Sequence, residues 1–215
     1  MTVRLHVQGE FALFSRPELR VERVSYDVPT PSAAQGILEA IHWKPAITWI
    51  TERIHVLKPI RFVGIRRNEV KVKAGWRSAR GGGIDISDTE GVRVQRTALV
   101  LADVAYVIEA RLELTDKAGE QDSLAKHYAM FERRAAKGQC FHQPCLGTRE
   151  FACDFTLLKP DDPLPPGLSE TRDLGLMVHG LDYPPDGRPT PRYFRATMTN
   201  GVITVPHPRA AEVLR

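Results

Sequence analysis

The first 158 of the 215 residues contain two helical patterns, and each lies between two strand patterns. Apolar residues alternate with polar ones where strands are expected and recur every three or four positions where helices are expected. The expected order is strand 2–8, helix 30–42, strand 50–70 with a proline-marked break, strand 94–114, helix 123–138 and strand 149–158. This order is the split βαβ pattern of ferredoxin-like and RNA-recognition-motif folds. The sequence therefore predicts an α+β chain with a ferredoxin-like domain over residues 1–158.

The helix ends and the C-terminal region carry recognisable signals. Thr30 is a good N-cap before Pro31, and the second helix is expected to begin after Asp122 as its N-cap. Four prolines within residues 160–166 predict a semi-rigid linker. Beyond it, two strand patterns and the dipeptide Asn200-Gly201 predict a hairpin. We therefore expect residues 159–215 to form a linker and a small C-terminal antiparallel β-lobe that packs on the first domain.

The composition is that of a globular protein, with 42% hydrophobic and 26% charged residues. No apolar run approaches the ~18 to 20 residues that cross a bilayer, and charged residues stand where a signal peptide would carry its apolar segment. Three cysteines do not suggest a disulfide framework. These features predict a cytoplasmic protein with reduced thiols and no membrane partner.

Positive charge is concentrated in one segment. The net charge is only +4, yet residues 53–80 hold nine basic side chains and one acid, followed by three consecutive glycines at 81–83. Such segregation is typical of a nucleic-acid partner, although a solvated basic hairpin explains the charge equally well. The indole of Trp76 could stack on a base or anchor the loop. The candidate phosphate-binding residues are Arg66, Arg67, Lys71, Lys73, Arg77 and Arg80.

The helix over 123–138 has two faces. Leu124, Tyr128, Phe131 and Ala135 form an apolar stripe, so Tyr128 is expected in the core. The cations Lys126, Arg133 and Lys137 form a row that could face a phosphate chain. His127 lies at the seam between stripe and row, where it could be half desolvated and still reach a ligand. A plain boundary histidine is the more common interpretation of such a position.

RNA carries its own nucleophile, the 2′-hydroxyl group, so its cleavage requires a base, an acid and a cation near the phosphate, and no metal or other cofactor. His127 and Lys126 have the right chemistry. Their ~100° separation on a helix lets them flank one phosphate but not aim at one atom. His42, at the end of the first helix, is the third candidate.

The cysteines permit a rival site. Cys140, His142, Cys145 and Cys153 supply enough ligands for tetrahedral zinc. Their spacing fits no standard zinc knuckle, and Cys153 lies in an expected strand, which favours buried thiols. We therefore expect no metal site.

Three stretches together resemble a known family: "FSRPELRVERVSYDVPTPSAAQGILEAIHWKP", "KHYAMFERRAAKGQ" and "PCLGTREF". The resemblance is to the CRISPR-associated family numbered five, in its subtype I-C (Dvulg) branch. It implies a ferredoxin fold with a small β-lobe and metal-independent cleavage of CRISPR repeat RNA. It also implies that the protein keeps the 5′ handle of the crRNA and joins the other subunits of the type I-C surveillance complex.

The same resemblance implies roles for individual residues. The family's lysine–histidine pair falls on Lys126 and His127, and its third catalytic position, a tyrosine, falls on His42. Thr148 stands where the family often has cysteine, which argues further against zinc. Two other functions remain open: a non-catalytic crRNA-binding subunit, and a less specific nucleic-acid binder or nuclease that also takes duplex DNA.

Overall fold

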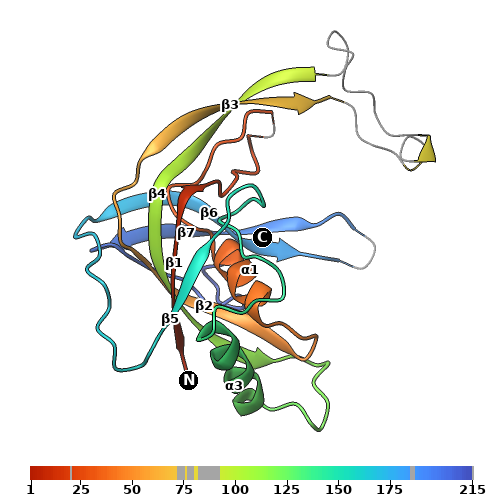
Figure 1. Cartoon of the computed structure of the whole chain (residues 1–215), viewed down its shortest axis with the longest axis vertical. Coiled ribbons are helices and arrows are strands. Elements are labelled where there is room, and N and C mark those ends of the chain that lie inside the picture. Colours follow the sequence, from red (N-terminus) through yellow and green to blue (C-terminus); the bar gives the residue numbers. More distant parts are fainter. Residues whose placement is uncertain (20, 72–75, 77–79, 82–92, 185–186, 215) are drawn as a thin grey trace.

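The computed structural model describes residues 1–19, 21–71, 76, 80–81, 93–184 and 187–214. Within these residues, two long helices accompany an extended antiparallel sheet (Figure 1). The elements, in chain order, are β1 (Val3–Ala12), α1 (Pro31–Ile41), β2 (Ile47–Val56), β3 (Phe62–Val70), β4 (Arg93–Leu114), α3 (Leu124–Ala135), β5 (Asp154–Leu158), β6 (Arg172–Asp182), β7 (Thr190–Thr199) and β8 (Val202–Thr204). The predicted α+β class is confirmed.

The 22-residue strand β4 organises the sheet. Its second half lies between β1 and β2, and its first half pairs with β3. The full strand order is β5-β1-β4-β2-β8-β7-β6, and each of these pairings is antiparallel. The expected strand over 94–114 is thus correct, whereas the expected strand over 50–70 is two strands, β2 and β3, because Pro59 interrupts it.

Strand β3 and the first half of β4 form a two-stranded ribbon, with Phe62 opposite Leu101 and Val70 opposite Arg93. Figure 1 shows this ribbon curving away from the body of the molecule, at the opposite end from α3. Most of its β3 side chains are exposed, because no second layer covers it. Arg66 and Arg67 of the basic segment recognised in the sequence lie on β3, and Lys71 directly follows it.

The predicted hairpin near the C-terminus is present between β7 and β8. Asn200 and Gly201 both have positive φ, at 49° and 75°, as a tight hairpin turn requires. Strand β8 pairs with β2, placing Arg53 opposite Thr204, so the C-terminal strands continue the main sheet. The proposed domain boundary at 158/159 stays a prediction.

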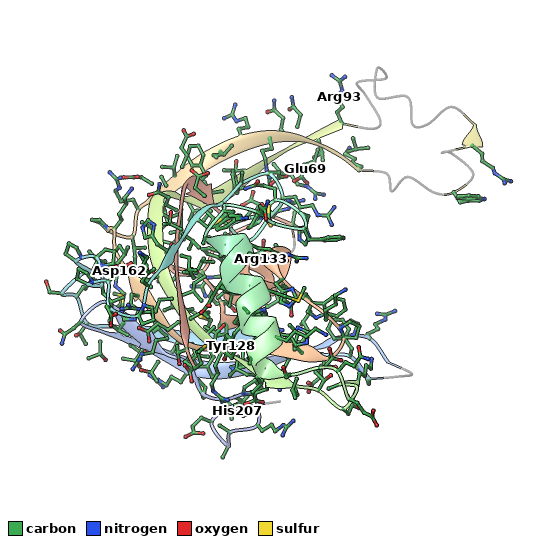
Figure 2. The ribbon with its side chains drawn as sticks, turned by 60° about the horizontal axis from the view of Figure 1, so that its bottom comes forward. Glu69, Arg93, Tyr128, Arg133, Asp162 and His207 are labelled. Carbon is green, nitrogen blue, oxygen red and sulfur yellow. The ribbon has the colours of Figure 1, made fainter. Side chains whose placement is uncertain are left out.

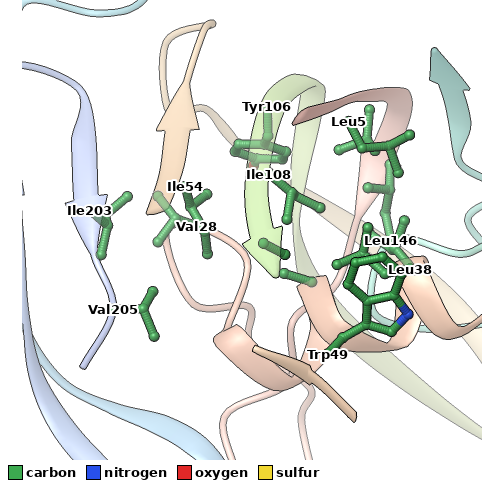
Figure 3. Close-up of a cluster of buried hydrophobic side chains, with 14 of the residues drawn as sticks. Leu5, Val28, Leu38, Trp49, Ile54, Tyr106, Ile108, Leu146, Ile203 and Val205 are labelled. Atoms are coloured by element: carbon green, nitrogen blue, oxygen red, sulfur yellow. The ribbon is translucent and has the colours of Figure 1, made fainter. Parts of the chain in front are cut away.

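The core fills the space between the sheet and the two helices. Alternate residues of β1, among them Leu5 and Val7, are buried, as the period of a strand dictates. Figure 3 shows Leu5, Ile54, Tyr106 and Ile108 from the strands beside Leu38 from α1. One core therefore fixes α1 and α3 relative to each other.

The N-cap predicted for α1 is correct, and the one predicted for α3 is not. Thr30 caps α1 as predicted, since its hydroxyl accepts a hydrogen bond from the Ala33 amide at 3.1 Å. The predicted cap Asp122 is wrong for α3: Ser123 is the N-cap and accepts from the Lys126 amide at 3.3 Å. This frees the Asp122 carboxylate for other partners.

The predicted apolar stripe of α3 is partly wrong. Tyr128, Phe131 and Ala135 are buried, but Leu124 is 38% exposed, because it stands at the first helical position, beyond the core. His127 takes the fourth buried position. The last predicted strand of the first domain begins only at Asp154, since the chain before it turns, with Cys145 bridging to Ala152.

Candidate active site and basic surfaces

His42 and His127, 85 residues apart in the chain, lie in contact. His42 follows the last residue of α1, and its amide still donates to Leu38 O at 3.0 Å. His127 projects from the first turn of α3 toward it. The distance from His42 Nε2 to His127 Nδ1 is 3.0 Å, with the ring planes 28° apart. The structure thus brings together two of the three predicted catalytic side chains.

The first end of this pair is fixed by Arg134. Its Nη1 donates to Ile41 O at 2.9 Å and lies 3.5 Å from His42 Nδ1. Because a guanidinium group only donates, this contact favours the tautomer of His42 that is unprotonated at Nδ1. His42 then carries its proton on Nε2 and donates it to His127 Nδ1. In this arrangement Nδ1 of His127 accepts and Nε2 carries a proton.

The second end meets a carboxylate. His127 Nε2 lies 3.2 Å from Asp122 Oδ1, and Lys126 Nζ lies 3.7 Å from the same oxygen. Lys126 also donates to Gln121 O at 3.1 Å. Although neighbours on a helix point in different directions, His127 and Lys126 therefore converge on one anionic group. That the two side chains flank a phosphate stays a prediction.

The environment changes two pKa values in this chain of hydrogen bonds. Burial, followed by the positive charge of Arg134, lowers the pKa of His42 to about 4. The pKa of Asp122 is lowered, first by the hydrogen bond from the Gly119 amide and further by His127 and Lys126. At neutral pH, His42 is therefore a neutral hydrogen-bonding group and not a cationic acid.

The prediction that His127 lies half desolvated at a seam is wrong. Only 1% of its surface is exposed, and His42 is fully buried. The reason is that the start of α3 packs on the end of α1, so the imidazole fills the space between them. The accessible groups around the pair are Lys126, about half exposed, and Asp122, about a quarter exposed.

Sequence reasoning missed both Arg134 and the role of Asp122. Arg134 stands seven residues after His127, which is two helical turns and therefore the same face of α3. That spacing could have identified it. The sequence pattern favours Asp122 as the helix cap, and only the three-dimensional structure shows Ser123 in that place.

The two other cations of the predicted row are exposed. Arg133 lies on α3 and Lys137 follows its end by two residues, and Figure 2 shows Arg133 on the same helix as the buried Tyr128. Together with Lys126 they form a positive row beside the imidazole pair. Tyr128 is in the core as expected, where its hydroxyl accepts from the Leu112 amide at 2.7 Å.

The second basic region is the β3–β4 ribbon. Arg66 and Lys71 are exposed there, whereas Arg67 is engaged by Glu150 and by Glu69. Trp76 is 73% exposed, with the Arg80 guanidinium 4.9 Å from its ring centre. Lys73 and Arg77 lie outside the described residues. Figure 1 shows the β3–β4 ribbon and α3 at opposite ends of the molecule, so the ribbon and the imidazole pair are separate regions.

The candidate zinc ligands do not gather in the structure. Cys153 is fully buried, and burial raises its pKa to about 12, while Cys140 and Cys145 are half-buried. Across the described part of the chain, no three histidine, cysteine or acidic side chains lie close enough to hold a metal ion. In the same part of the chain, no helix is long and apolar enough to span a membrane.

Comparison with known proteins places the chain among the CRISPR-associated proteins. A solved structure described as a CRISPR-associated protein superimposes with a TM-score of 0.72 at 26% identity, covering 100% of this chain and 97% of the other. Within that class the chain belongs to the Cas5d family, described as CRISPR-associated protein (Cas_Cas5), which matches residues 2–206. The predicted family is confirmed.

Two curated relatives are each named CRISPR pre-crRNA endoribonuclease Cas5d. The protein from Mannheimia succiniciproducens is 53% identical over 223 residues, covering 99% of this chain and 98% of its own length. The protein from Thermus thermophilus is 41% identical over 230 residues, covering 99% and 95%. The similarity therefore extends over the imidazole pair and the basic ribbon alike.

Proposed function

We propose that this protein is a metal-independent endoribonuclease that cleaves CRISPR repeat RNA and then holds the 5′ handle of the crRNA in a type I-C surveillance complex. The observation that carries the proposal is the hydrogen-bonded His42–His127 pair, which ends on a carboxylate shared with Lys126. The names of two relatives that match the whole chain support the substrate.

The reaction needs no external nucleophile. The 2′-oxygen attacks the adjacent phosphorus, the bond from phosphorus to the 5′-oxygen breaks, and the products carry a 2′,3′-cyclic phosphate and a 5′-hydroxyl group. One proton leaves the 2′-hydroxyl and one reaches the 5′-oxygen. In our proposal water takes the proton of the 2′-hydroxyl group, and His127 donates the proton on its Nε2 to the 5′-oxygen and recovers one from solvent. Lys126 stabilises charge on the phosphorane oxygens.

His42 acts on His127 in this proposal. It is buried and neutral, and it contacts Nδ1 of His127 rather than solvent. This contact orients the His127 ring and leaves Nε2 directed toward the Asp122 side. A histidine at this position thus fulfils a positioning role, where the wider family is expected to have a tyrosine.

The RNA can reach His127 only if the Asp122 side chain moves away from it. The carboxylate occupies Nε2 of His127 and would repel a phosphate. We propose that an RNA phosphate replaces the Asp122 oxygen between His127 and Lys126, since both side chains already converge on an anion there. The cations Arg133 and Lys137 extend this positive surface along α3.

The fold fits this function in two further respects. The strand order β5-β1-β4-β2, with α1 and α3 as the two connections, is the arrangement we propose as the ferredoxin-like unit, over residues 1–158. The ribbon residues Arg66, Arg67, Lys71, Trp76 and Arg80, together with Lys73 and Arg77, are proposed contacts to RNA phosphates and bases. Affinity from phosphates alone also permits binding of duplex DNA.

Cleavage of the cognate repeat RNA in excess EDTA tests the proposal. We expect cleavage with EDTA at the same rate as without it, and none of an RNA with 2′-deoxyribose at the scissile nucleotide. The second result follows because that RNA lacks its nucleophile. Undiminished cutting of the deoxy substrate would refute the mechanism, and dependence on added metal would refute metal independence.

One observation favours a second function, that of a crRNA-binding subunit without catalysis. Both imidazoles are buried, as purely structural histidines would be. A cleavage assay distinguishes the two functions, because both require affinity for RNA and only the first requires that the RNA be cut.

A further inference from the structure

A cavity of about 420 Å³ opens beside the imidazole pair, between the end of α1 and the segment that follows α3. Trp43 and Phe141 line it, with 51% and 85% of their surfaces exposed. Lys44 and Arg134 bring positive charge to the same cavity, and Glu39 brings a carboxyl group. Its volume lies within the ~300–1,000 Å³ range of small-molecule sites.

The two aromatic residues are attached to backbone that is already fixed. The Phe141 amide donates to Ala40 O at 2.8 Å, which ties the segment after α3 to the last turn of α1. Trp43 directly follows His42, whose carbonyl oxygen accepts from Trp49 Nε1 at 2.9 Å. The exposed rings therefore stand on a preorganised frame, which lowers the entropic cost of stacking a ligand between or against them.

The cavity is linked to the proposed active site by two residues. Arg134 lines the cavity and also lies 3.5 Å from His42 Nδ1. Trp43 is the chain neighbour of His42. A ligand held in the cavity would thus lie against residues that directly adjoin the imidazole pair.

The lining identifies the class of ligand. Exposed aromatic rings beside lysine and arginine are the combination that binds single-stranded nucleic acid, with bases stacked on the rings and phosphates on the cations. Glu39 adds a carboxyl group whose pKa is raised by burial. A nucleotide has a flat base for the aromatic rings and a phosphate for the cations, so it suits this lining better than a free phosphate does.

We propose that the Trp43–Phe141 cavity, at the Arg134 end of the imidazole pair, binds one unpaired nucleobase of the repeat RNA near the cleavage site, with Lys44 and Arg134 facing its backbone. The identity of the RNA rests on the proposed function, while the stacking site rests on the cavity itself. The bound base would hold the RNA strand across the imidazole pair, so that the scissile linkage lies at the Asp122 end, beside His127.

Crosslinking tests the site without relying on cleavage. Repeat RNA with 2′-deoxyribose at the scissile nucleotide is bound to the intact protein and irradiated with ultraviolet light, and crosslinked peptides are identified by mass spectrometry. We expect crosslinks at Trp43 or Phe141 and none at Tyr183, which is also exposed, at 73%, but lines a different cavity. Crosslinks confined to other residues would overturn the inference.

A kinetic experiment identifies the base. Single-turnover cleavage is measured for RNAs that each lack one base near the cut, with wild-type protein, Trp43→Ala, Phe141→Ala and the control Tyr183→Ala. We expect one abasic position to slow the wild type about tenfold or more, and to have no further effect in Trp43→Ala. The conservative Trp43→Phe should restore most of the rate.

The outcomes separate this inference from the proposed function. If wild-type protein cleaves RNA but both alanine variants are as fast and equally sensitive to base removal, the stacking site is wrong and the endoribonuclease proposal stands. If wild-type protein does not cleave RNA and crosslinks still form at Trp43 or Phe141, the endoribonuclease proposal is wrong and the stacking site stands. Loss of subunit assembly in the variants, with no crosslink to RNA, would assign the cavity to a protein partner and overturn the inference.

Discussion

The α1–α3 junction and the β3–β4 ribbon are both rich in cationic or titratable side chains, but they are built in opposite ways. At the junction, His42 and His127 are buried and form a continuous chain of hydrogen bonds from Arg134 to Asp122. On the ribbon, Arg66 and Lys71 are exposed and face water. Short, directional contacts suit proton transfer, whereas exposed charges act over several ångströms and are screened by salt.

This difference implies a division of labour. A change at the junction should alter the rate of the chemical step with little change in affinity, because few of its atoms reach the surface. A change on the ribbon should alter affinity with little change in the rate at saturation. The experiments below are designed to contradict that division, beginning with the largest effect.

Replacing His127 by alanine should produce the largest effect. We expect single-turnover cleavage of repeat RNA to fall by about 10²- to 10⁴-fold, which is the usual contribution of a positioned acid or base. Dissociation constants from fluorescence anisotropy should change by less than about threefold. Since His127 is buried, thermal unfolding must be compared first, and His127→Asn serves as the variant that keeps a polar side chain.

A parallel loss of RNA affinity and cleavage in a folded His127 variant would contradict the division. It would mean that the imidazole supports binding and not chemistry, as in the non-catalytic alternative. The control is Ala136→Gln, an exposed position at the C-terminal end of α3 and outside the row of cations, which should leave both quantities unchanged.

The local elements of this fold could be predicted from the sequence because their signals are local. Thr30-Pro31 fixes the start of α1, alternation fixes β4, and Asn200-Gly201 fixes the last hairpin. The order of strands and helices then restricts the sheet to few arrangements. What the pattern could not give is the pairing of β8 with β2, since nothing local in either strand specifies a partner.

The candidate site was predictable only in part, for a similar reason. The family resemblance indicated His42, Lys126 and His127, but no spacing in the chain reveals that two histidines 85 residues apart share a hydrogen bond. Their burial depends on how α1 and α3 pack, which is a tertiary property. Charge segregation drew attention to the ribbon, yet charge alone does not say that it lies away from the imidazole pair.

The second-largest difference between the two regions is expected in how the free energy of unfolding changes with pH. The pKa of His42 is about 4 in the folded protein and about 6.5 in the unfolded chain, so the unfolded chain binds more protons between these values. Stability should therefore fall as pH falls through that window. The His42 contribution between pH 7 and pH 5 is up to about 2 kcal/mol.

Urea unfolding of wild-type protein and His42→Gln at several pH values measures this contribution. His6 and His179 also have lowered pKa values, so the quantity of interest is the difference between the two slopes. The variant should show the shallower loss of stability. Arg66→Ala, on the ribbon, should keep the wild-type slope. Identical slopes for wild type and His42→Gln would show that His42 has the same pKa in the folded and the unfolded chain, which would contradict the buried, neutral His42.

The smallest effect is expected on the ribbon. The double variant Arg66→Ala/Lys71→Ala should weaken RNA binding about 3- to 10-fold, because each exposed cation neutralises one phosphate at most. The slope of log affinity against log salt should fall by about 0.7 for each phosphate of a single strand that is no longer neutralised. Because these side chains lie apart from His127, the cleavage rate at saturating protein should remain that of wild type. A lower saturated rate would place the ribbon next to the scissile phosphate in the complex, which would require it to fold over the α1–α3 junction when RNA binds.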